Sequence, residues 1–394
     1  METVETMERQ PRGLLTPFHV VAVLIVAAGI FVTILRFTKG LGAVTHLSDN
    51  NPWGIWIGFD LMVGVALAAG GYVTSSACYL FGMKRYHAAV RPAILTGFLG
   101  YFFVVIALLY DLGRPWRLPY PFLFGWGTTS LLFEVAFCVA LYLTVLFLEF
   151  SPAALEWLGL KKARNLAHRL TILLTILGVV LSTLHQSSLG ALYLAAPSKL
   201  HPLWYTPYLP VYFFVSSIIA GLSMVIFEGA LSHKALHHRM GKAYLDNHED
   251  LMFAFAKAAS MVLAGYFTIK WVGVAEADQW KLLTTGYGLW FLVEMFGFIA
   301  LPSLLYAVGF REKRAGIVKT ASVIAVLGIV INRLNVSLIC FNWQLPSNQR
   351  YTPSLMEVII SLFMVTLIVL AFRCIANRMP IFDTHPYYRD SHGE

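Results

Sequence analysis

An ionisable side chain inside an apolar segment is the first feature of this sequence that could do chemistry. His185 lies in the run LHQSSLG, residues 184–190, which interrupts an apolar stretch from residue 170 to residue 197. A polar group within a bilayer is costly unless it has a partner or lines a cavity, so such a residue predicts a functional site. Histidine can also donate, accept and shuttle protons near neutral pH. We therefore expect residues 184–190 to line a ligand pocket.

Other polar groups fall inside apolar runs as well. The carboxyl groups of Glu134, Glu228 and Glu294 could pass protons, because water-linked carboxylates recur in membrane pumps and transporters. Asp60 and Tyr101 could contact a ligand oxygen, but two alternatives stay open. A neighbouring helix or an arginine could hold Asp60, and a backbone carbonyl could accept a hydrogen bond from a buried Tyr101.

The distribution of histidines and cysteines argues against a metal centre. Of the 12 histidines, only His185 lies well inside an apolar run, since His19 stands at the edge of the first run, whereas haem between membrane helices is commonly held by paired axial ligands. The cysteines, Cys78, Cys138, Cys340 and Cys374, stand apart, and iron–sulfur clusters need grouped thiolates. We expect no haem, iron–sulfur cluster or other metal site in this chain.

A quinone fits the remaining groups. Its two carbonyl oxygens need hydrogen-bond donors on reduction, its protons need titratable groups nearby, and its tail needs an apolar cleft. The expected quinone-facing groups are His185, Ser187, Ser188, Tyr101 and Asp60. A different class of function stays open, namely a proton-translocating or anchoring membrane module that binds no quinone, and the carboxyl groups would suit it too.

Membrane-spanning helices are the elements that must position these groups. The 394 residues are 58% hydrophobic and 13% charged, with a mean hydropathy of +0.68, whereas soluble domains carry about 25% charged residues. A helix needs about 20 apolar residues to cross a bilayer, and continuous runs favour helices over a barrel. Ten such runs are present, at residues 18–36, 53–81, 92–112, 122–148, 170–195, 209–231, 252–272, 283–308, 317–341 and 355–375.

The predicted fold is an all-α polytopic membrane protein of about ten transmembrane helices in one membrane domain, residues 1–394. Residues 53–195 and 209–341 are predicted to form two four-helix bundles, flanked by the first helix and by a last helix at residues 355–375. An internal duplication would explain this arrangement. Glu134 and Glu294 would then occupy the third helix of each bundle, with His185 and Arg333 on the fourth.

Basic residues predict the orientation, because short loops rich in Lys and Arg favour the cytoplasm. The loops after even-numbered runs hold most of them, so both termini, including a charged tail at residues 1–13, are predicted to be cytoplasmic. An amphipathic segment at residues 152–169 is expected to lie on the inner membrane surface. The formal charge of +8 then follows from topology, and no nucleic-acid partner is needed to explain it.

Six motifs occur in order along the chain and carry a family resemblance. They are NPWGIWIGFDLMVG (51–64), YDLGRPW (110–116), LLFEVAFC (131–138), LHQSSLG (184–190), KLHPLW (199–204) and VIFEGAL (225–231). Together they resemble the integral membrane subunits of the polysulfide reductase and nitrite reductase (NrfD-like) superfamily. The ten-helix layout is most similar to the hydrogenase-2 membrane subunit branch.

The resemblance implies a haem-free membrane subunit of a respiratory oxidoreductase in the prokaryotic cytoplasmic membrane. Such subunits exchange electrons between menaquinone and a periplasmic iron–sulfur protein, beside a multihaem cytochrome c or a hydrogenase or molybdopterin subunit. The resemblance associates Tyr101, Glu134, His185 and Glu228 with quinone binding and proton transfer. Similar motif contexts add further residues to the expected site, namely Asp60, Asp111, Arg114, Arg333 and Glu294. As an alternative to contacting a ligand, Asp111 and Arg114 could form an ion pair that stabilises the loop.

Overall fold

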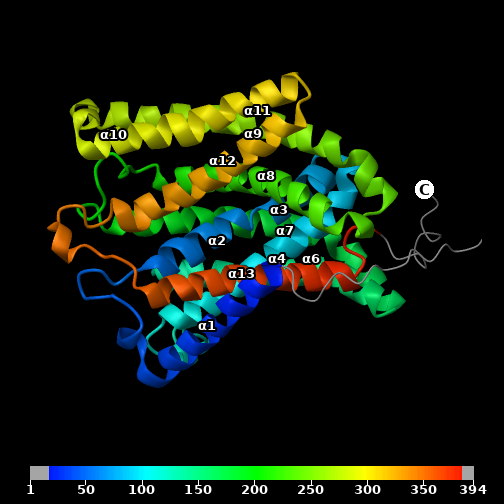
Figure 1. Cartoon of the computed structure of the whole chain (residues 1–394), viewed down its shortest axis with the longest axis horizontal. Coiled ribbons are helices and arrows are strands. Elements are labelled where there is room, and N and C mark those ends of the chain that lie inside the picture. Colours follow the sequence, from blue (N-terminus) through cyan, green and yellow to red (C-terminus); the bar gives the residue numbers. More distant parts are fainter. Residues whose placement is uncertain (1–16, 384–394) are drawn as a thin grey trace, which may run out of the picture.

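The computed structural model describes residues 17–383 of the chain. Within that range, ten helices are long and apolar enough to cross a membrane (Figure 1). The predicted tail at residues 1–13 lies outside the described residues. The spans are Pro17–Lys39, Trp56–Leu80, Lys84–Asp111, Leu131–Trp157, Lys161–Ala195, Leu209–Arg239, Lys242–Glu276, Gly286–Arg311, Ala315–Ile339 and Leu355–Arg378.

The all-α polytopic fold is confirmed, since the described residues form helices and only two isolated β-bridges. Three helix starts lie nine or ten residues from the starts of the expected runs: the fifth and seventh spans begin earlier, at Lys161 and Lys242, and the fourth begins later. The fourth run was expected to begin at residue 122, but α6 (Leu131–Trp157) begins nine residues later. The Ser130 side chain accepts a hydrogen bond from the backbone of Phe133 and so caps this helix, as serine commonly does at helix starts. Residues before it form the short helix α5 (Tyr120–Leu123) and turns.

The segment at residues 152–169 does not form a separate surface helix, so that expectation is wrong. Its first part continues α6 to Trp157, and its second part begins α7 (Lys161–Ala191). The chain reverses between them at Gly159, whose φ of +74° is readily adopted only by glycine. The basic and leucine side chains here therefore extend two membrane helices beyond the bilayer.

Helices far apart in sequence pack side by side (Figure 1). One group is α4 (Val90–Asp111), α6, α7 and the interrupted second span, and another is α8 (Leu209–Leu236), α9 (Lys242–Glu276), α11 (Leu301–Arg311) and α12 (Ala315–Leu334). The first helix, α1 (Pro17–Lys39), packs against the last, α13 (Leu355–Arg378). These contacts are compatible with two bundles and two flanking helices, and that division stays a prediction.

Among the described residues, three spans contain π-helical stretches. The second consists of a π-helical turn at Trp56–Leu61, α2 (Met62–Leu67), α3 (Gly70–Ser75) and another π-helical turn at Ser76–Leu80. The eighth contains α10 (Gly286–Leu292) and a π-helical stretch at Val293–Ala300, and the ninth ends in one at Asn335–Ile339. Because π-helical turns occur frequently at functional sites, these interruptions mark segments of interest.

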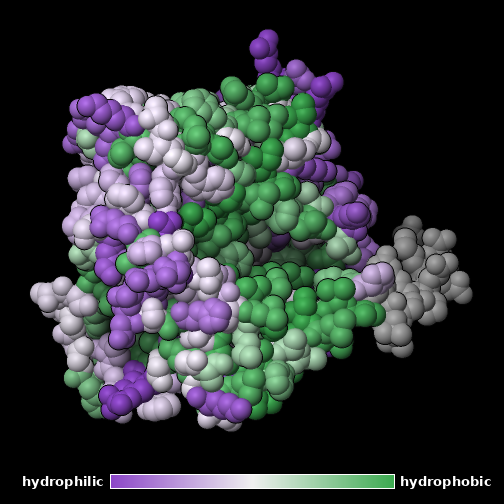
Figure 2. All heavy atoms as spheres, turned by 60° about the vertical axis from the view of Figure 1, so that its left-hand side comes forward, coloured by the Kyte–Doolittle hydropathy of each residue, from purple (hydrophilic) through white to green (hydrophobic). Residues whose placement is uncertain are grey.

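The surface reflects the expected membrane setting. A broad apolar area covers the flank of the molecule, with hydrophilic residues gathered beyond it (Figure 2). We call the end that carries the connections after spans 2, 4, 6 and 8 the basic end, because most of the lysines and arginines lie there. The other end is called the opposite end.

Candidate functional site

His185 lies at the centre of the first group of helices and is fully buried. Its Nε2 and the Tyr101 hydroxyl form a short hydrogen bond, and its Nδ1 lies 2.8 Å from the carbonyl oxygen of Leu181, one turn earlier on α7. The Tyr142 ring stacks on the imidazole at a centroid distance of 5.6 Å. The structure therefore brings together two of the residues expected at the site, His185 and Tyr101.

An interruption in the neighbouring helix supplies this cluster with a backbone acceptor. The Ala69 N–H donates to Ala66 rather than to Val65, because α2 ends there. The released carbonyl of Val65 accepts from Gln186 Nε2 at 3.0 Å, and the Tyr101 hydroxyl lies 3.5 Å away. Broken helices are tolerated inside membranes where other groups satisfy the freed backbone. Gln186 and Tyr101 do so here.

Several hydroxyls of the cluster have no hydrogen-bond partner of good geometry among the described residues. They include Tyr142 Oη and Ser182 Oγ. The amide oxygen of Gln186, Oε1, also lacks such a partner. Ser182 is buried and lies one turn before His185 on α7. Leaving such a group unsatisfied costs about 1–3 kcal/mol, and buried polar groups of this kind are where functional sites are found.

Glu134 lies toward the opposite end, in the first turn of α6, and not at mid-membrane as its place in the apolar run suggested. Its side chain is exposed. Ser188 Oγ donates to Glu134 Oε1 at 2.5 Å and to the carbonyl of Leu184 at 2.9 Å. Glu134 thus contacts the segment of residues 184–190, at the edge of the buried cluster. Ser187, which precedes Ser188, is half-buried.

A large apolar cavity lies on the other side of the second span. Its volume is about 410 Å³, and Figure 2 shows the apolar face hollowed in this region. The walls come from the second span, α4, α8, α12 and α13, and include Gly64, Gly100, Phe227, Val326 and Ile368. It contains two of the expected carboxyl groups, Asp60 and Glu228.

Each of these carboxyl groups has one neutral hydrogen-bond donor. Ser361 donates to Asp60 at 2.6 Å, and Thr96 donates to Glu228 at 2.6 Å. Among the described residues neither carboxyl group forms a salt bridge, so an arginine does not hold Asp60. Polar groups that converge in an otherwise apolar cavity are typical of ligand sites.

The cavity and the His185 cluster share a thin wall. Gly64 and Gly100 line the cavity, whereas the next residue in each case, Val65 and Tyr101, faces His185 or Gln186. Close packing requires the small residue at position 100, because a Cβ there would lie 2.7 Å from that of Ala68. His185 and Tyr101 do not line the cavity themselves.

Glu294 belongs to a separate network in the second group of helices. Its two oxygens accept from Lys270 at 3.2 Å, Asn332 at 2.7 Å, Trp204 at 2.8 Å and Asn335 at 2.6 Å. All of these side chains are buried. A carboxyl group with four donors, one of them cationic, is held firmly in its ionised form.

Arg333 joins the same network from α12. It donates to Asn332 Oδ1 at 3.0 Å, to Ser216 at 2.9 Å and to the carbonyl of Phe213 at 3.1 Å. The guanidinium also lies 3.9 Å from the centroid of the Phe213 ring. Arg333 is therefore remote from the cavity lining and adjoins Glu294 instead.

Asp111 and Arg114 do not form the expected pair. Arg114 is exposed, and among the described residues no ion pair joins it to Asp111. The cation that acts on Asp111 is Arg36 of the first helix. Arg36 donates to the carbonyls of Tyr110 at 2.7 Å and Leu112 at 2.6 Å, so it anchors α1 to the end of α4.

Comparison with known proteins gives the family. Residues 43–341 match the family described as "Polysulphide reductase, NrfD", which is more than half of the chain. The chain belongs to the NrfD family. The expected superfamily is thereby confirmed.

Three relatives of this NrfD-family chain are similar over most of their length. A Nitratidesulfovibrio vulgaris chain named only "Protein" is 65% identical over 97% of this chain and 98% of its own. The "Probable Ni/Fe-hydrogenase 2 b-type cytochrome subunit" of Escherichia coli is 32% identical, covering 88% and 87%. The "Menaquinone reductase, integral membrane subunit" of N. vulgaris is 27% identical, covering 90% and 88%.

The described part of this NrfD-family chain holds no group of three or more His, Cys, Asp or Glu side chains placed to bind a metal ion. At His185 both ring nitrogens already contact a partner, Tyr101 or Leu181. A haem ligand needs one ring nitrogen free for the iron, so the present arrangement of His185 does not suit that role. The absence of haem from this chain stays a prediction.

Sequence reasoning missed several polar groups. Lys270 lies inside an expected apolar run, and its single charge was a usable signal that went unused. Gln186 lies within LHQSSLG, but its role depends on the break in the second span. Arg36 and Glu149 lie at the ends of runs, where a charged residue normally signals only the membrane edge.

Proposed function

We propose that this NrfD-family chain is the quinone-binding membrane subunit of a multisubunit respiratory oxidoreductase. It would exchange electrons between menaquinone or menaquinol and an iron–sulfur or cytochrome partner on the periplasmic side. The observation that carries the proposal is the apolar cavity of about 410 Å³ with Asp60 and Glu228 in its lining. The names of the menaquinone reductase and hydrogenase-2 relatives add support.

The cavity residues fit a quinone. Apolar side chains such as Phe227, Val326 and Ile368 suit an isoprenoid tail. Asp60 and Ser361 could hold a carbonyl oxygen of the head group at the end of the cavity nearer the periplasmic partner. A bound menaquinone would supply two-electron chemistry coupled to two protons.

Proton transfer is the second task of the site. Glu228 lies in the cavity toward the basic end, hydrogen-bonded to Thr96, and can hold a proton there. Glu134 and Glu294 stay proposed proton-transfer groups as well, although the four donors to Glu294 favour a fixed charge. Seven other residues were expected to contact the quinone and would act outside the cavity lining. They are His185, Ser187, Ser188, Tyr101, Asp111, Arg114 and Arg333.

The proposed setting is the cytoplasmic membrane of a prokaryote, with both termini and the basic end in the cytoplasm. The partners would include a periplasmic iron–sulfur subunit. A multihaem cytochrome c and hydrogenase- or molybdopterin-type subunits would be further members of the complex. Lipid surrounds the chain, consistent with its ten apolar spans.

The cavity can be tested by filling it. Val326→Trp places an indole into the lining, whereas Val323→Trp on the same helix lies outside it and is exposed. We expect V326W to weaken binding of menaquinone-4 at least about tenfold, equivalent to about 1.4 kcal/mol, and to weaken the tail-less menadione less. Quenching of intrinsic fluorescence by each quinone measures both affinities in the purified protein.

V323W should bind both quinones as the unmodified chain does. Asp60→Asn should lower quinone reduction by about 10²-fold or more, because an acid–base group is lost. If V326W and D60N both bind and reduce menaquinone-4 normally, the cavity is not the quinone site.

A second candidate function is a proton-translocating module with no quinone site of its own. The observation that favours it is the Tyr101–His185 cluster, which is buried and polar yet does not line the cavity. Quinone extracted from the purified chain, or saturable menadione binding to it, would exclude this candidate. Absence of both, with proton uptake retained, would establish it.

A further inference from the structure

α7 presents a polar face to the protein and an apolar face outward. Its polar side chains recur at intervals of three or four residues, with one interval of seven across Gly178, which places them along one face of a helix. They are His168, Thr171, Thr175, Ser182, His185 and Ser188. On the other face, side chains such as Ile172, Ile176, Val180 and Leu184 are exposed. A buried polar stripe of this length in a membrane helix calls for a function.

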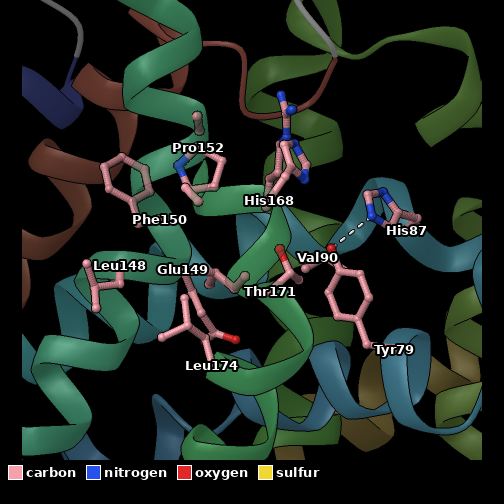
Figure 3. A pocket seen from close by; sticks show the side chains of 14 residues that line it. Tyr79, His87, Val90, Leu148, Glu149, Phe150, Pro152, His168, Thr171 and Leu174 are labelled. Carbon is pink, nitrogen blue, oxygen red and sulfur yellow. Dashed lines mark hydrogen bonds between the residues drawn. The ribbon is translucent and has the colours of Figure 1, made fainter. Parts of the chain in front are cut away.

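The stripe begins at a small pocket at the basic end. This pocket has a volume of about 40 Å³ and is lined by Tyr79, His87, Glu149, His168 and Thr171, among others (Figure 3). Tyr79 and His87 share a hydrogen bond of 2.8 Å. Thr175, the next residue of the stripe, donates to Glu149 at 3.2 Å. A carboxyl group therefore joins the pocket to the stripe.

Gly178 leaves the space through which the stripe continues. A Cβ at this position would lie 3.5 Å from a ring carbon of Tyr142 and 3.9 Å from Glu149 Oε2. The carboxyl group, the phenol ring and Val145, 3.7 Å from the same point, thus border one space beside Gly178. Beyond it, the buried hydroxyls of Tyr142 and Ser182 have no partner of good geometry among the described residues. Such groups can pass a proton through intervening water.

The stripe reaches the Tyr101–His185 pair one turn before its last residue, Ser188. Ser182 lies one turn before His185 on the same buried face of α7, and Tyr101 is hydrogen-bonded to His185 Nε2. Gly100, which precedes Tyr101, lines the quinone cavity. The polar groups therefore extend from the basic end to the wall of the cavity.

We propose that this face of α7 conducts protons from the basic end to Tyr101 and His185, with Glu149 as the entry group. The inference rests on the proposed function, because reduction of a quinone by two electrons from the partner subunits consumes two protons. It assigns the entry to a residue outside the set Glu134, Glu228 and Glu294.

The test uses the complex that copurifies with this chain, reconstituted into liposomes that contain a pH-sensitive dye. A membrane-impermeant electron donor added outside reduces the partner subunits, and menadione is the acceptor. We expect Glu149→Gln to slow proton uptake from the lumen and quinone reduction together, at least about tenfold, with menadione affinity unchanged. Glu149→Asp keeps a titratable carboxyl group and should restore most of the rate.

Two further variants separate conduction from a structural role. Gly178→Val fills the space between Tyr142 and Glu149 without removing any titratable group, and we expect the same slowing. Thr175→Val removes a hydroxyl from the stripe, whereas Thr183→Val removes one from the same helix outside it. T175V should slow proton uptake, and T183V should not.

The outcomes distinguish this inference from the proposed function. Normal luminal proton uptake in E149Q, G178V and T175V, with quinone reduction still lost in D60N, would overturn the proton route alone. Loss of proton uptake in E149Q, with quinone reduction unaffected by D60N and V326W, would retain the route and remove the cavity as the quinone site.

Discussion

Gln186 illustrates at the residue scale how one side chain compensates for a broken helix. The end of α2 releases the carbonyl of Val65, and Gln186 Nε2 donates to it within a fully buried environment. The backbone N–H of Ala69 does not replace that donor, since it donates to Ala66. The interruption of the second span and the polar residue on α7 therefore depend on each other.

Gln186→Met keeps the size of this side chain and removes the donor. We expect a loss of about 1–3 kcal/mol in the free energy of unfolding, because a buried carbonyl is left without its partner. Thermal unfolding in detergent measures the change. A conservative Thr183→Val on the same helix should cost less, and an unchanged stability in Q186M would show that Val65 does not need this bond.

At the scale of elements, the loop between the fifth and sixth spans is built around His201. Its backbone N–H donates to Cys340 at 2.9 Å, its Nδ1 accepts from the backbone of Leu203 at 3.2 Å, and its ring packs against Tyr287 and Trp343. Burial lowers the pKa of His201 to about 4. The neutral imidazole is thus the form that holds the loop to the end of the ninth span.

This loop should make stability depend on pH. The pKa of His201 is lower in the folded chain than the unfolded value of about 6.5. The unfolded state therefore binds the proton more readily, and stability falls as pH decreases from about 6.5 toward 4. We expect a loss on the order of 1–3 kcal/mol across that range, measured by thermal unfolding.

The control for this prediction is His201→Asn, whose side-chain oxygen can replace Nδ1 as the acceptor but does not titrate. H201N should show a shallower decline between pH 6.5 and 4. A decline equal to that of the unmodified chain would assign the pH dependence to other groups.

At the scale of the whole molecule, buried charges are distributed unequally. In the second group of helices, Glu294 and Lys270 form an ion pair of 3.2 Å with almost no exposure. Near the basic end of the first group, Glu156 pairs with Arg91 at 2.8 Å and Arg164 at 3.2 Å. Asp60 and Glu228, in the cavity, have only neutral donors. Fixed pairs hold the helices together, and we propose that the two groups without a counter-charge exchange protons.

A double-mutant cycle on Glu294 and Lys270 tests this distinction. Glu294→Gln or Lys270→Met alone should destabilise the chain by about 3–5 kcal/mol, because each leaves the charge of the other residue buried without its counter-charge. The double variant should be less destabilised than the sum of the two.

Quinone reduction by the stably folded double variant gives a second measurement. Retained reduction supports a structural role for Glu294, whereas a loss of tenfold or more would support the proton-transfer role expected from sequence.

The sequence alone determined the ten helices and the family, because apolar run length and motif order are local properties. It placed His185, Tyr101, Asp60 and Glu228 on the correct helices. It could not show that Asp60 and Glu228 line one cavity while His185 and Tyr101 lie behind its wall. Which side of a helix faces which neighbour depends on packing between distant segments.

Only the tertiary structure decided the partners. Arg36 replaces Arg114 near Asp111, and Glu294 is neutralised by Lys270 from another helix. The buried face of the run LHQSSLG continues along α7 through Ser182 and Thr175, and Thr175 donates to Glu149. Hydrogen bonds and ion pairs between helices require the side chains to meet in space, and the sequence specifies that meeting only through the complete fold.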